Sequence, residues 1–450
     1  MASRSRLFRL PALLALVFFS RLLFALLIWK VSGPSGFYTP DSAAYVVLAR
    51  SLLHGSFSDN GLPHIARTLG FPLLLMPAVA SGHFLVVAIF ENLLLATCSA
   101  WLIWRIVHGL SAESGASAWA VLLYCFEPVA LLWSDKIMTE TAFSTLLLLF
   151  IWLVIRFFRE PTYATLLLAA LVLGFATHTR PITLYLGLWL IPVFLFFPRT
   201  LPMGQRVSRA IVFVVVFALT LAPWILRNAK VADYPGFSSI SDDNLYFYQA
   251  AAVEANLQNK SFGQQQEEMG FWDVQRYLQA HPEQSTWSRG QIAVFTRAEA
   301  KRIISQHLPI YLRLHARGFI ILLFDTVATV ILQTLGLYPE RGGLLTRTVD
   351  QGLYRGMMWL IREHPVAGTV FVLLGIQLMF YYVLALFGVR HLPVAAACFF
   401  GSLLLYFILI SSGPYASGRL RAPIMLLVCI SAGIAVANWR PLRARAPKPV

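Results

Sequence analysis

The chain has 450 residues, of which 58% are hydrophobic and only 13% are charged. Soluble globular proteins carry about 25% charged residues, so this composition excludes a water-soluble globule. The apolar residues form long blocks that approach the roughly 20 residues a helix needs to cross a bilayer. Because these blocks lack the alternation of barrel strands, the sequence predicts an all-α fold, a polytopic transmembrane helix bundle.

Basic residues outnumber acidic residues, 36 to 21, which gives a formal net charge of +15. In a soluble protein this excess would suggest a nucleic-acid partner. Here the basic residues gather in short connectors between apolar blocks, as expected on the cytoplasmic side of a membrane protein. We therefore expect membrane lipids, and no nucleic acid, as partners. The four cysteines all lie inside apolar blocks, which disfavours a disulfide framework or a cysteine metal site.

The apolar blocks predict about ten membrane spans, within a range of roughly 10 to 12. The first, 10–30, follows an arginine-rich start and is too long for the core of a signal peptide, so we interpret it as a retained span. The others are 83–104, 117–134, 138–158, 163–179, 181–197, 209–226, 366–387, 392–411 and 420–438. With the basic connectors inside, residues 31–82, 134–137, 227–365 and 412–419 fall on the outer side.

The first outer loop, 31–82, contains a predicted surface helix. Thr39 suits the N-cap position, and Pro40 suits the first helical position. Apolar side chains then recur on one side, which is typical of an amphipathic helix that lies along the membrane surface. This apolar side carries Tyr45, Leu48, Leu52 and Leu53.

The second long outer segment, 227–317, is polar and aromatic, and we expect an ordered loop with two or three helices. The block 318–335 is apolar enough to cross the membrane, but counting it would place the basic C-terminus outside. We therefore expect this block to lie in the interface, to re-enter, or to pair with a further span near 353–361. The chain divides into a catalytic transmembrane module, 1–226, the outer loop 227–317, and C-terminal transmembrane helices, 318–450.

Two residues of the first outer loop are candidates for chemistry. Asp41 stands at the start of the surface helix, on the same helix face as Tyr45. An ionised carboxylate at the membrane boundary can accept a proton from a hydroxyl nucleophile, but it can also simply stabilise a helix N-terminus. Arg67 precedes a Gly-Phe-Pro turn, and it either binds a phosphate bidentately or snorkels to the interface.

Charged residues also occur at three later outer positions. Asp135, Lys136 and Glu140 share a short connector, where charges are costly and tend to be functional or paired with one another. Arg180 joins two spans and can face a polar cavity. Before the last span, Arg419 and Arg421 lie outside, against the usual placement of basic residues. An anion is needed near these two arginines, and a lipid phosphate is the obvious choice.

Five short motifs occupy the outer connectors in a fixed order. They are Pro40–Tyr45, Arg67–Leu73, Asp135–Thr141, Thr179–Pro181 and Arg419–Pro423. In this order the chain resembles bacterial GT-C glycosyltransferases. It is similar to family 39, the group of dolichyl-phosphate-mannose–protein mannosyltransferases and aminoarabinose transferases. The resemblance covers the whole chain and implies a GT-C-like bundle.

The resemblance implies a polyprenyl-phosphate sugar donor and an acceptor hydroxyl on a lipid, a glycan or a protein. Transfer would occur on the periplasmic face of the bacterial inner (cytoplasmic) membrane. The first acidic position of the family maps onto Asp41, as the catalytic base, and the second maps onto Asp135, with Glu140 as a further catalytic candidate. Contacts to the donor phosphate are expected from Arg67, Arg419 and Arg421, with Lys136, Arg180 and Tyr45 as further substrate-binding residues.

The chain departs from the family pattern in its first loop, where Ser42 rather than a second acid follows Asp41. This difference disfavours a protein-mannosylating subtype. Where the metal dependence of the family applies, a divalent cation would bridge Asp41 and the phosphate, although the sequence itself shows no metal site. We assign no cofactor from the sequence.

A polytopic transporter or a flippase for lipid-linked sugars is the main alternative to an enzyme. Transporters usually place charges near the bilayer midplane and contain internal repeats and broken helices. We find no internal repeat, and apart from Arg21 the candidate charges lie at the outer ends of the spans. A non-catalytic assembly factor would explain the long outer loop, but not the outer arginines and carboxylates together. These patterns favour the glycosyltransferase.

Overall fold

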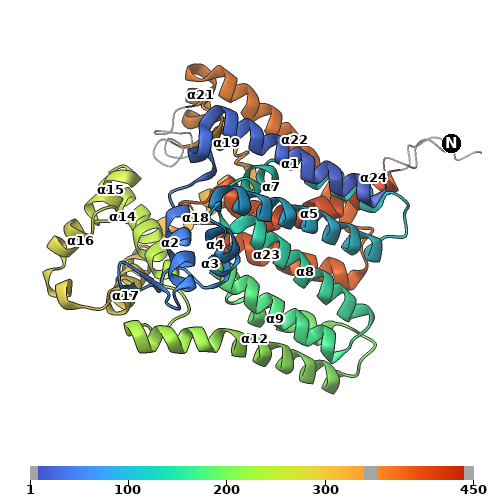
Figure 1. The fold of residues 1–450 in the computed structure, drawn as a ribbon, viewed down its shortest axis with the longest axis horizontal. Coiled ribbons are helices and arrows are strands. Elements are labelled where there is room, and N and C mark those ends of the chain that lie inside the picture. The colour runs from blue at the N-terminus through green and yellow to red at the C-terminus, as the bar shows by residue number, and fades with distance from the viewer. Residues whose placement is uncertain (1–8, 339–351, 440–450) are drawn as a thin grey trace, which may run out of the picture.

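The computed structural model describes residues 9–338 and 352–439, so the basic C-terminal tail from Arg440 and the N-terminal arginines before Arg9 lie outside the described ranges. The described chain is almost entirely helical, and its only strands are β1 (Ser58–Asp59) and β2 (Leu62–Pro63), which pair antiparallel. The predicted all-α membrane bundle is therefore confirmed. In Figure 1 the long helices run side by side, with small helices gathered at one end and the N-terminus at the other.

Seven helices in the described ranges are long and apolar enough to cross a membrane, and this number rises to nine if each bent helix pair counts as one span. The seven are α1 (Leu10–Ser32), α5 (Phe84–Leu110), α8 (Thr139–Arg159), α12 (Met203–Ala232), α22 (Pro365–Val389), α23 (Val394–Ser411), and η5 (Gly418–Arg421) with α24 (Ala422–Asn438). The bent pairs are α6 (Ala116–Cys125) with α7 (Pro128–Ser134), and α18 (Leu308–Phe324) with α19 (Ala328–Thr334). Each predicted span thus corresponds to helical structure, but not every one is a single long helix.

Two predicted spans are short or interrupted. Helix α9 (Tyr163–Thr179) has 17 residues, which makes it shorter than the other spans. The block 181–197 splits into η2 (Pro181–Thr183), α10 (Leu186–Trp189) and α11 (Ile191–Phe196). Prolines start η2 and α11, and because proline lacks a backbone N–H it interrupts continuous helical hydrogen bonding.

The block 318–335 covers the end of α18 and the whole of α19. These two helices form a bent pair whose axes differ in direction by 61°. Helix α18 passes the outer connector so closely that a Cβ on Gly318 would lie 1.9 Å from the carbonyl oxygen of Gly413. Helix α19 ends where the carbonyl of Thr334 accepts a hydrogen bond from Ser32, at the outer end of α1. Both arms thus touch outer elements, which fits a re-entrant hairpin. Helix α21 (Leu353–Glu363) has only 11 residues and is too short to be a further span.

The first outer loop folds over the outer end of the bundle. It contains η1 (Gly33–Phe37), α2 (Ser42–Leu53), the β1–β2 hairpin, α3 (Gly70–Leu74) and α4 (Met76–Ala80). The apolar side of α2 is buried at Tyr45 and Leu48, as the amphipathic pattern predicts, whereas Leu53 is exposed. The helix therefore packs on the bundle through its first half.

The second outer loop contains more helices than the two or three expected. They are α13 (Ile240–Asn244), the π-helix η3 (Leu245–Ala250), α14 (Ala251–Gln258), α15 (Phe262–Glu268), α16 (Val274–Ala280), η4 (Pro282–Thr286) and α17 (Arg289–Gln306). A small core of its own, which includes Tyr246, Val253 and Tyr277, holds them together. Most of these helices are too short to give a recognisable apolar periodicity, and this explains why the sequence predicts fewer helices than the loop contains.

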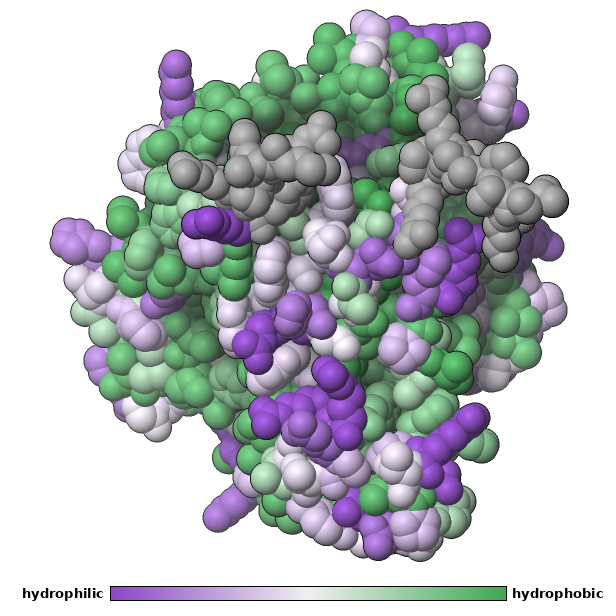
Figure 2. Space-filling model, turned by 90° about the vertical axis from the view of Figure 1, so that its right-hand side faces the viewer, coloured by the Kyte–Doolittle hydropathy of each residue, from purple (hydrophilic) through white to green (hydrophobic). Residues whose placement is uncertain are grey.

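The opposite end of the bundle carries the basic connectors. Figure 2 views the molecule from this end, and hydrophilic side chains gather across the middle of the face while apolar side chains surround it. The apolar flanks belong to helices whose outward residues are large and exposed, such as Leu23 of α1, Leu219 of α12 and Leu386 of α22. Exposed leucines on long helices are what a lipid-facing surface requires, so the chain is an integral membrane protein.

Candidate active site

Asp41 occupies the N-cap position of α2, because the helix begins at Ser42 and not at Pro40. Thr39, the expected N-cap, instead accepts a backbone hydrogen bond from Ser42 at 3.0 Å, and its hydroxyl meets that of Ser42 at 3.1 Å. The carboxylate of Asp41 accepts no hydrogen bond from the backbone of α2. It is therefore available to other partners at the outer end of the bundle.

Two arginines engage the two oxygens of Asp41. Arg67 Nη2 lies 2.6 Å from Oδ1, and Arg419 Nη1 lies 3.4 Å from Oδ2. The side chain of Asp41 nevertheless remains 34% exposed. A carboxylate offers about four acceptor positions, so Asp41 can still accept a hydrogen bond from a substrate.

Glu140 binds two arginines at the buried side of the same group. It lies in the first turn of α8, and its side chain is only 1% exposed. Arg180 Nη1 lies 3.1 Å from Oε1, and Arg419 Nε donates to the same oxygen. Arg419 therefore joins Glu140 to Asp41. We call Asp41, Arg67, Glu140, Arg180 and Arg419 the outer charge cluster.

Local packing fixes the arginines of this cluster. The hydroxyl of Thr68 donates to the carbonyl of His178 at 2.6 Å. Gly70 sits so tightly against the end of α9 that a Cβ there would lie 2.6 Å from the backbone of His178. These contacts dock the residues after Arg67 onto the residues before Arg180. Arg419 stands in η5, next to the most buried span, so its backbone is held by the bundle core.

Aromatic rings support two of the guanidinium groups. Arg67 lies over the ring of Tyr45 at 5.3 Å, and Arg419 lies over the ring of Trp133 at 5.1 Å. The ring of Tyr45 in turn packs edge-on against Phe71 at 5.0 Å. Cation–π contacts of this kind hold an arginine side chain without consuming its hydrogen-bond donors.

The outer charge cluster carries three guanidinium groups and two carboxylates within the described part of the chain. Because arginine stays protonated, the cluster has an excess of one positive charge when both acids are ionised. Arginine presents five donors in a planar fork, and the ion pairs of the cluster use only part of that capacity. The cluster is therefore suited to bind an anion with oxygen acceptors, such as a phosphate.

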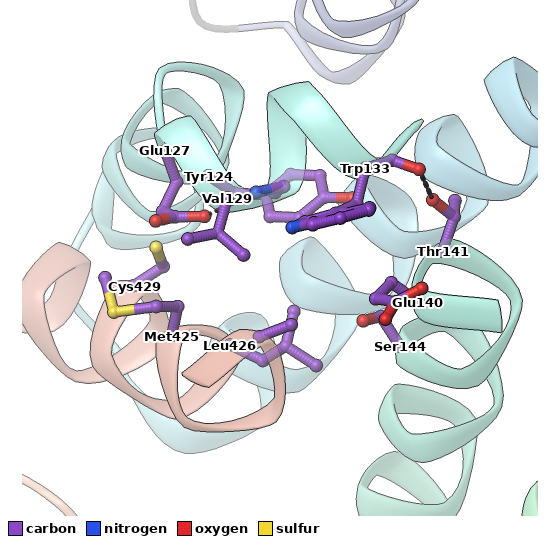
Figure 3. Close-up of a pocket in the computed structure, with 12 residues that line it drawn as sticks. Tyr124, Glu127, Val129, Trp133, Glu140, Thr141, Ser144, Met425, Leu426 and Cys429 are labelled. Atoms are coloured by element: carbon purple, nitrogen blue, oxygen red, sulfur yellow. Dashed lines mark hydrogen bonds between the residues drawn. The ribbon is translucent and has the colours of Figure 1, made fainter. Parts of the chain in front are cut away.

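A cavity leads from Glu140 into the bundle. It is small, and α24 forms one wall with Ala422, Met425, Leu426 and Cys429. Figure 3 shows Glu140 at one end of this space and Glu127 at the other, with Val129, Trp133 and Leu426 between them. The cavity thus has a charged entrance and a mainly apolar interior.

Asp135 and Lys136 do not join the outer charge cluster. Asp135 is fully buried, and neither of its carboxylate oxygens has a hydrogen-bond partner among the described residues. Burial raises the pKa of Asp135, and Arg21 and Lys136 only partly oppose this rise. The ammonium group of Lys136 donates to the backbone carbonyl of Gly36. Both side chains therefore point into the packing beneath η1, and Glu140 is the connector acid that meets the arginines.

Arg421 lies two residues from Arg419 but has different partners. Its guanidinium donates to the carbonyl oxygens of Leu322, Leu323 and Asp325, at 3.0, 3.2 and 2.7 Å. These carbonyls end α18, where no further helical turn is available to accept them. The side chain of Arg421 is thus held at the bend of the α18–α19 hairpin, away from the cluster.

Arg21 has the inward-facing partners that its place in the first span requires. It is fully buried and donates to the carbonyls of Tyr124 and Cys125 at 3.2 and 3.0 Å. These carbonyls end α6 at the break before α7. The arginine therefore closes an open helix end inside the membrane.

Two residues of the second outer loop lie within electrostatic range of the cluster and were not singled out from the sequence. Asp243, in α13, lies close enough to Arg67 for the guanidinium to lower its pKa, and Tyr248, in η3, interacts electrostatically with Asp41, Arg67 and Arg419. Asp243 follows Asp242 in a polar stretch, where nothing in the local pattern separates a site residue from a solvated one. Only the folding of this loop over the bundle reveals their position.

The residues of the cluster do not form a metal site. No group of three or more His, Cys, Asp or Glu residues comes together in the described chain. Both oxygens of Asp41 already face arginines, and adjacent guanidinium groups repel a divalent cation. The donor set around Asp41 therefore fits an anion rather than a bridging cation.

No protein-family model matches this chain, and no curated protein sequence matches it. Among solved structures, the chain is similar to the archaeal oligosaccharyltransferase AglB from Archaeoglobus fulgidus, in complex with an inhibitory peptide and a dolichol-phosphate. The two are 10% identical with a TM-score of 0.46, over 94% of this chain and 50% of that chain. The chain thus spans about half the length of that protein.

Proposed function

We propose that this protein is a membrane glycosyltransferase of the GT-C type, which transfers a sugar from a polyprenyl-phosphate donor to an acceptor hydroxyl at the outer face of the membrane. The observation that carries the proposal is the outer charge cluster. It brings residues from α2, the first loop, α8, the end of α9 and η5 to one place. The five members come from four separate outer connectors of the sequence, since Asp41 and Arg67 share the first loop, and they contact one another.

The arginines of the cluster suit the leaving group of this reaction. When the bond between the sugar and the phosphate breaks, negative charge grows on the phosphate oxygen. Arg67 and Arg419 are partly exposed, at 20% and 29% of their side-chain surface, so a phosphate can reach them. Arg180 is 12% exposed and lies deeper, where the low dielectric strengthens its attraction for an anion.

The surroundings of the cluster suit an amphiphilic donor. The cluster stands where the spans end, so a phosphate bound there would remain at the interface while its lipid chain lies in hydrocarbon. The cavity behind Glu140 is lined mainly by apolar side chains of α7 and α24, such as Val129 and Leu426. A soluble nucleotide sugar would gain nothing from this apolar lining.

The two acids of the cluster have different tasks in this proposal. Glu140 is buried and holds Arg180 and Arg419 in place. Asp41 is more exposed, and it holds Arg67 and Arg419 on its two oxygens at the entrance of the site. The sugar and the acceptor molecule are not specified by these contacts.

Purified protein in lipid nanodiscs, given a radiolabelled polyprenyl-phosphate-linked sugar and a cell-envelope extract as the acceptor source, tests the proposal. We expect release of polyprenyl phosphate together with label in an extract component. The Arg419→Ala variant should lose this activity, whereas Arg390→Ala, which alters an arginine at the opposite end of the bundle, should retain it. No donor turnover by the wild-type protein with any extract or lipid-linked sugar would contradict the proposal.

A lipid-linked-sugar flippase is a second candidate function, because the α6–α7 span is broken by 60° with Glu127 at the break. Broken helices and buried charges at membrane depth are typical of transporters. Glu127 Oε1 has no hydrogen-bond partner among the described residues, and the carboxylate lines the cavity. Movement of a fluorescent polyprenyl-phosphate sugar across liposomes that contain the protein, without chemical turnover, would favour this function over transfer.

A further inference from the structure

Residues 243–250 of the second outer loop pass over the outer charge cluster, and we call them the roof segment. At one end, Asp243 lies within electrostatic reach of Arg67. Farther along, Tyr248 interacts with Asp41, Arg67 and Arg419, and its ring meets that of Tyr415 at 5.0 Å. The roof segment thus spans the cluster from the Arg67 side to the connector that precedes Arg419.

The roof segment is attached directly beside Arg67. The backbone N–H of Ser239 donates to the carbonyl of Ile65 at 3.0 Å, and the hydroxyl of Ser238 donates to the carbonyl of Ala66 at 2.5 Å. Asp243 follows one helical turn later, and its own N–H bonds back to Ser239. The position of Asp243 relative to Arg67 is therefore set by backbone contacts rather than by a flexible side chain.

A π-helical turn, η3, forms the rest of the roof segment. Such turns are rare and are frequently found at functional sites. Tyr248 of this turn and Asp243 both lie within electrostatic range of Arg67. The neighbouring Asp242 faces away, because Arg297 binds its two oxygens at 2.7 Å each and Tyr234 donates to it at 2.7 Å.

Asp243 and Asp41 differ in how their carboxylates are occupied. Asp41 holds two guanidinium groups. The carboxylate of Asp243 forms no ion pair or hydrogen bond with any other described residue, and the side chain is partly exposed. The oxygens of Asp41 are thus already held by arginines, whereas the carboxylate of Asp243 is open to a bound hydroxyl.

We propose that Asp243 accepts the proton of the acceptor hydroxyl. This inference rests on the proposed transferase function, and it moves the role of base from Asp41, which the sequence suggests, to the roof segment. In the step, the acceptor O–H bond breaks and its proton passes to the Asp243 carboxylate. The acceptor oxygen forms a bond to the anomeric carbon. The bond from that carbon to the phosphate oxygen breaks, and its electron pair stays on the phosphate, beside Arg67 and Arg419.

The charges balance through this step. With Asp243 ionised, three carboxylates face three guanidinium groups, and a phosphodiester donor adds one negative charge. As the leaving phosphate gains a second negative charge, Asp243 loses its own by taking the proton. The total charge of the closed site is therefore constant, which avoids a costly build-up of charge near the membrane. The proton then leaves from Asp243 to water on the outer side.

The pKa of Asp243 supports this role. Burial and the neighbouring Asp242 raise it from its ordinary value to about 7, while Arg67 opposes the rise. Tyr277 of α16 faces Asp243 as well, and Arg297 of α17 is already occupied by Asp242. A general base works best when its pKa lies near the operating pH. Because the base must be ionised, activity should rise as the pH rises through about 7.

The pH dependence of donor turnover tests the proposal. The full-length protein in nanodiscs is given a polyprenyl-phosphate-linked sugar and envelope extract, and kcat/KM is measured from pH 5 to 9. A phosphodiester donor has no proton that titrates near neutrality. We expect wild-type activity to fall about tenfold per pH unit below the midpoint. In Asp243→Asn, turnover should drop by about 100- to 10,000-fold and lose this acid limb.

Binding of polyprenyl phosphate, measured on the same variants, separates this proposal from the transferase proposal itself. Asp243→Asn should bind it as well as wild type or better, because only a negative charge is removed. Asp243→Glu should regain part of the turnover with a shifted midpoint. Glu268→Gln, in the same loop but paired with Lys260 at its surface, is the matched control and should behave as wild type.

Each outcome assigns the failure to one proposal. If Asp243→Asn keeps the acid limb and most of its turnover, Asp243 is not the base, although the transferase proposal stands. Loss of polyprenyl-phosphate binding in Asp243→Asn would show that the residue only shapes the donor site, and this too would overturn the proposal. If wild-type protein turns over no donor, the transferase proposal itself fails.

Discussion

The two ends of the helix bundle both carry arginines, but they use them differently. At the inner end the arginines lie over aromatic rings, meet carbonyl oxygens or pair with an acid of their own helix end: Arg105 is over Trp101, Arg206 donates to Leu195, and Arg156 lies 3.9 Å from Glu160. At the outer end, Arg67, Arg180 and Arg419 meet carboxylates contributed by other helices. Arginine thus helps to orient the protein in the membrane at one end, and at the other end it forms part of an ordered site.

The difference shows when an arginine indicates function in a membrane protein. An inner arginine satisfies the positive-inside tendency wherever it points, so its exact partner matters little. An outer arginine runs against that tendency. The structure holds each outer arginine of the cluster with an acid, and an acid at membrane depth is itself costly. The arginines and carboxylates of the outer charge cluster stabilise one another, and the five residues together carry one excess positive charge. A bound anion would neutralise that charge.

Replacing Arg419 should break the outer site most severely. Arg419→Ala removes the only group that contacts both acids of the cluster, and it leaves Glu140 with Arg180 alone. Loss of one donor to a developing oxyanion costs about 100- to 1,000-fold in rate, so we expect at least that loss in donor turnover. Arg419→Lys keeps the charge but not the fork, and it should remain strongly impaired. Wild-type turnover by either variant would contradict the role of Arg419.

Replacing Asp41 should stop sugar transfer without unfolding the protein. Asp41→Asn keeps the shape of the side chain but removes the charge that separates Arg67 from Arg419. We expect a loss of about 100-fold or more in transfer, with wild-type expression and an unchanged elution profile in detergent. Full activity of purified Asp41→Asn would remove Asp41 from the mechanism.

Replacing Arg421 should reveal a structural arginine within the outer region. The sequence suggests a phosphate contact, whereas the side chain binds three carbonyls at the end of α18. Arg421→Ala leaves these carbonyls unsatisfied, and each buried polar group without a partner costs about 1–3 kcal/mol. We expect a lower melting temperature in detergent, measured by thermal unfolding, with a modest change in turnover per folded molecule. Normal stability together with weakened donor binding would instead support the phosphate contact that the sequence suggests for Arg421.

Replacing an inner arginine should have the smallest effect and completes the comparison. Arg390→Ala removes a contact over Phe387 on the exposed inner connector. Surface substitutions of this kind usually change stability by about 0.5 kcal/mol or less, and we expect turnover within about twofold of wild type. If Arg390→Ala were as damaging as Arg419→Ala, the two ends would not differ as the contacts indicate.

The sequence predicts the membrane bundle well because apolar blocks report burial in lipid directly. It does not reveal the break before Pro128 or the 61° bend before Ala328, since single acids, Glu127 and Asp325, interrupt otherwise apolar blocks without marking a helix end. The N-cap of α2 is also misplaced by two residues, because a Thr-Pro pair suits a helix start, whereas the chain makes one more turn before Ser42. Boundaries of this kind depend on local hydrogen bonds that composition does not encode.

Part of the candidate site can also be predicted from the sequence, because the pattern of apolar blocks shows where the connectors lie. Asp41, Arg67, Glu140, Arg180 and Arg419 all lie in or next to outer connectors, and the alternation of spans places such connectors at one end of the bundle. Whether Asp135 or Glu140 points into the site depends on where α8 begins, and the structure turns Asp135 into the packing. Asp243 lies far along the chain in a loop whose path over the bundle is set by tertiary contacts such as Ser239 to Ile65.

Binding of polyprenyl monophosphate tests the central claim most directly, because it asks only whether the outer charge cluster holds a lipid phosphate. The measurement is native mass spectrometry of wild type, Arg419→Ala and Arg390→Ala, released from nanodiscs at increasing polyprenyl-phosphate concentration. We expect saturable binding of one lipid to wild type and to Arg390→Ala, and at least tenfold weaker binding to Arg419→Ala, the equivalent of about 1.4 kcal/mol. Equal binding by all three proteins would contradict the account.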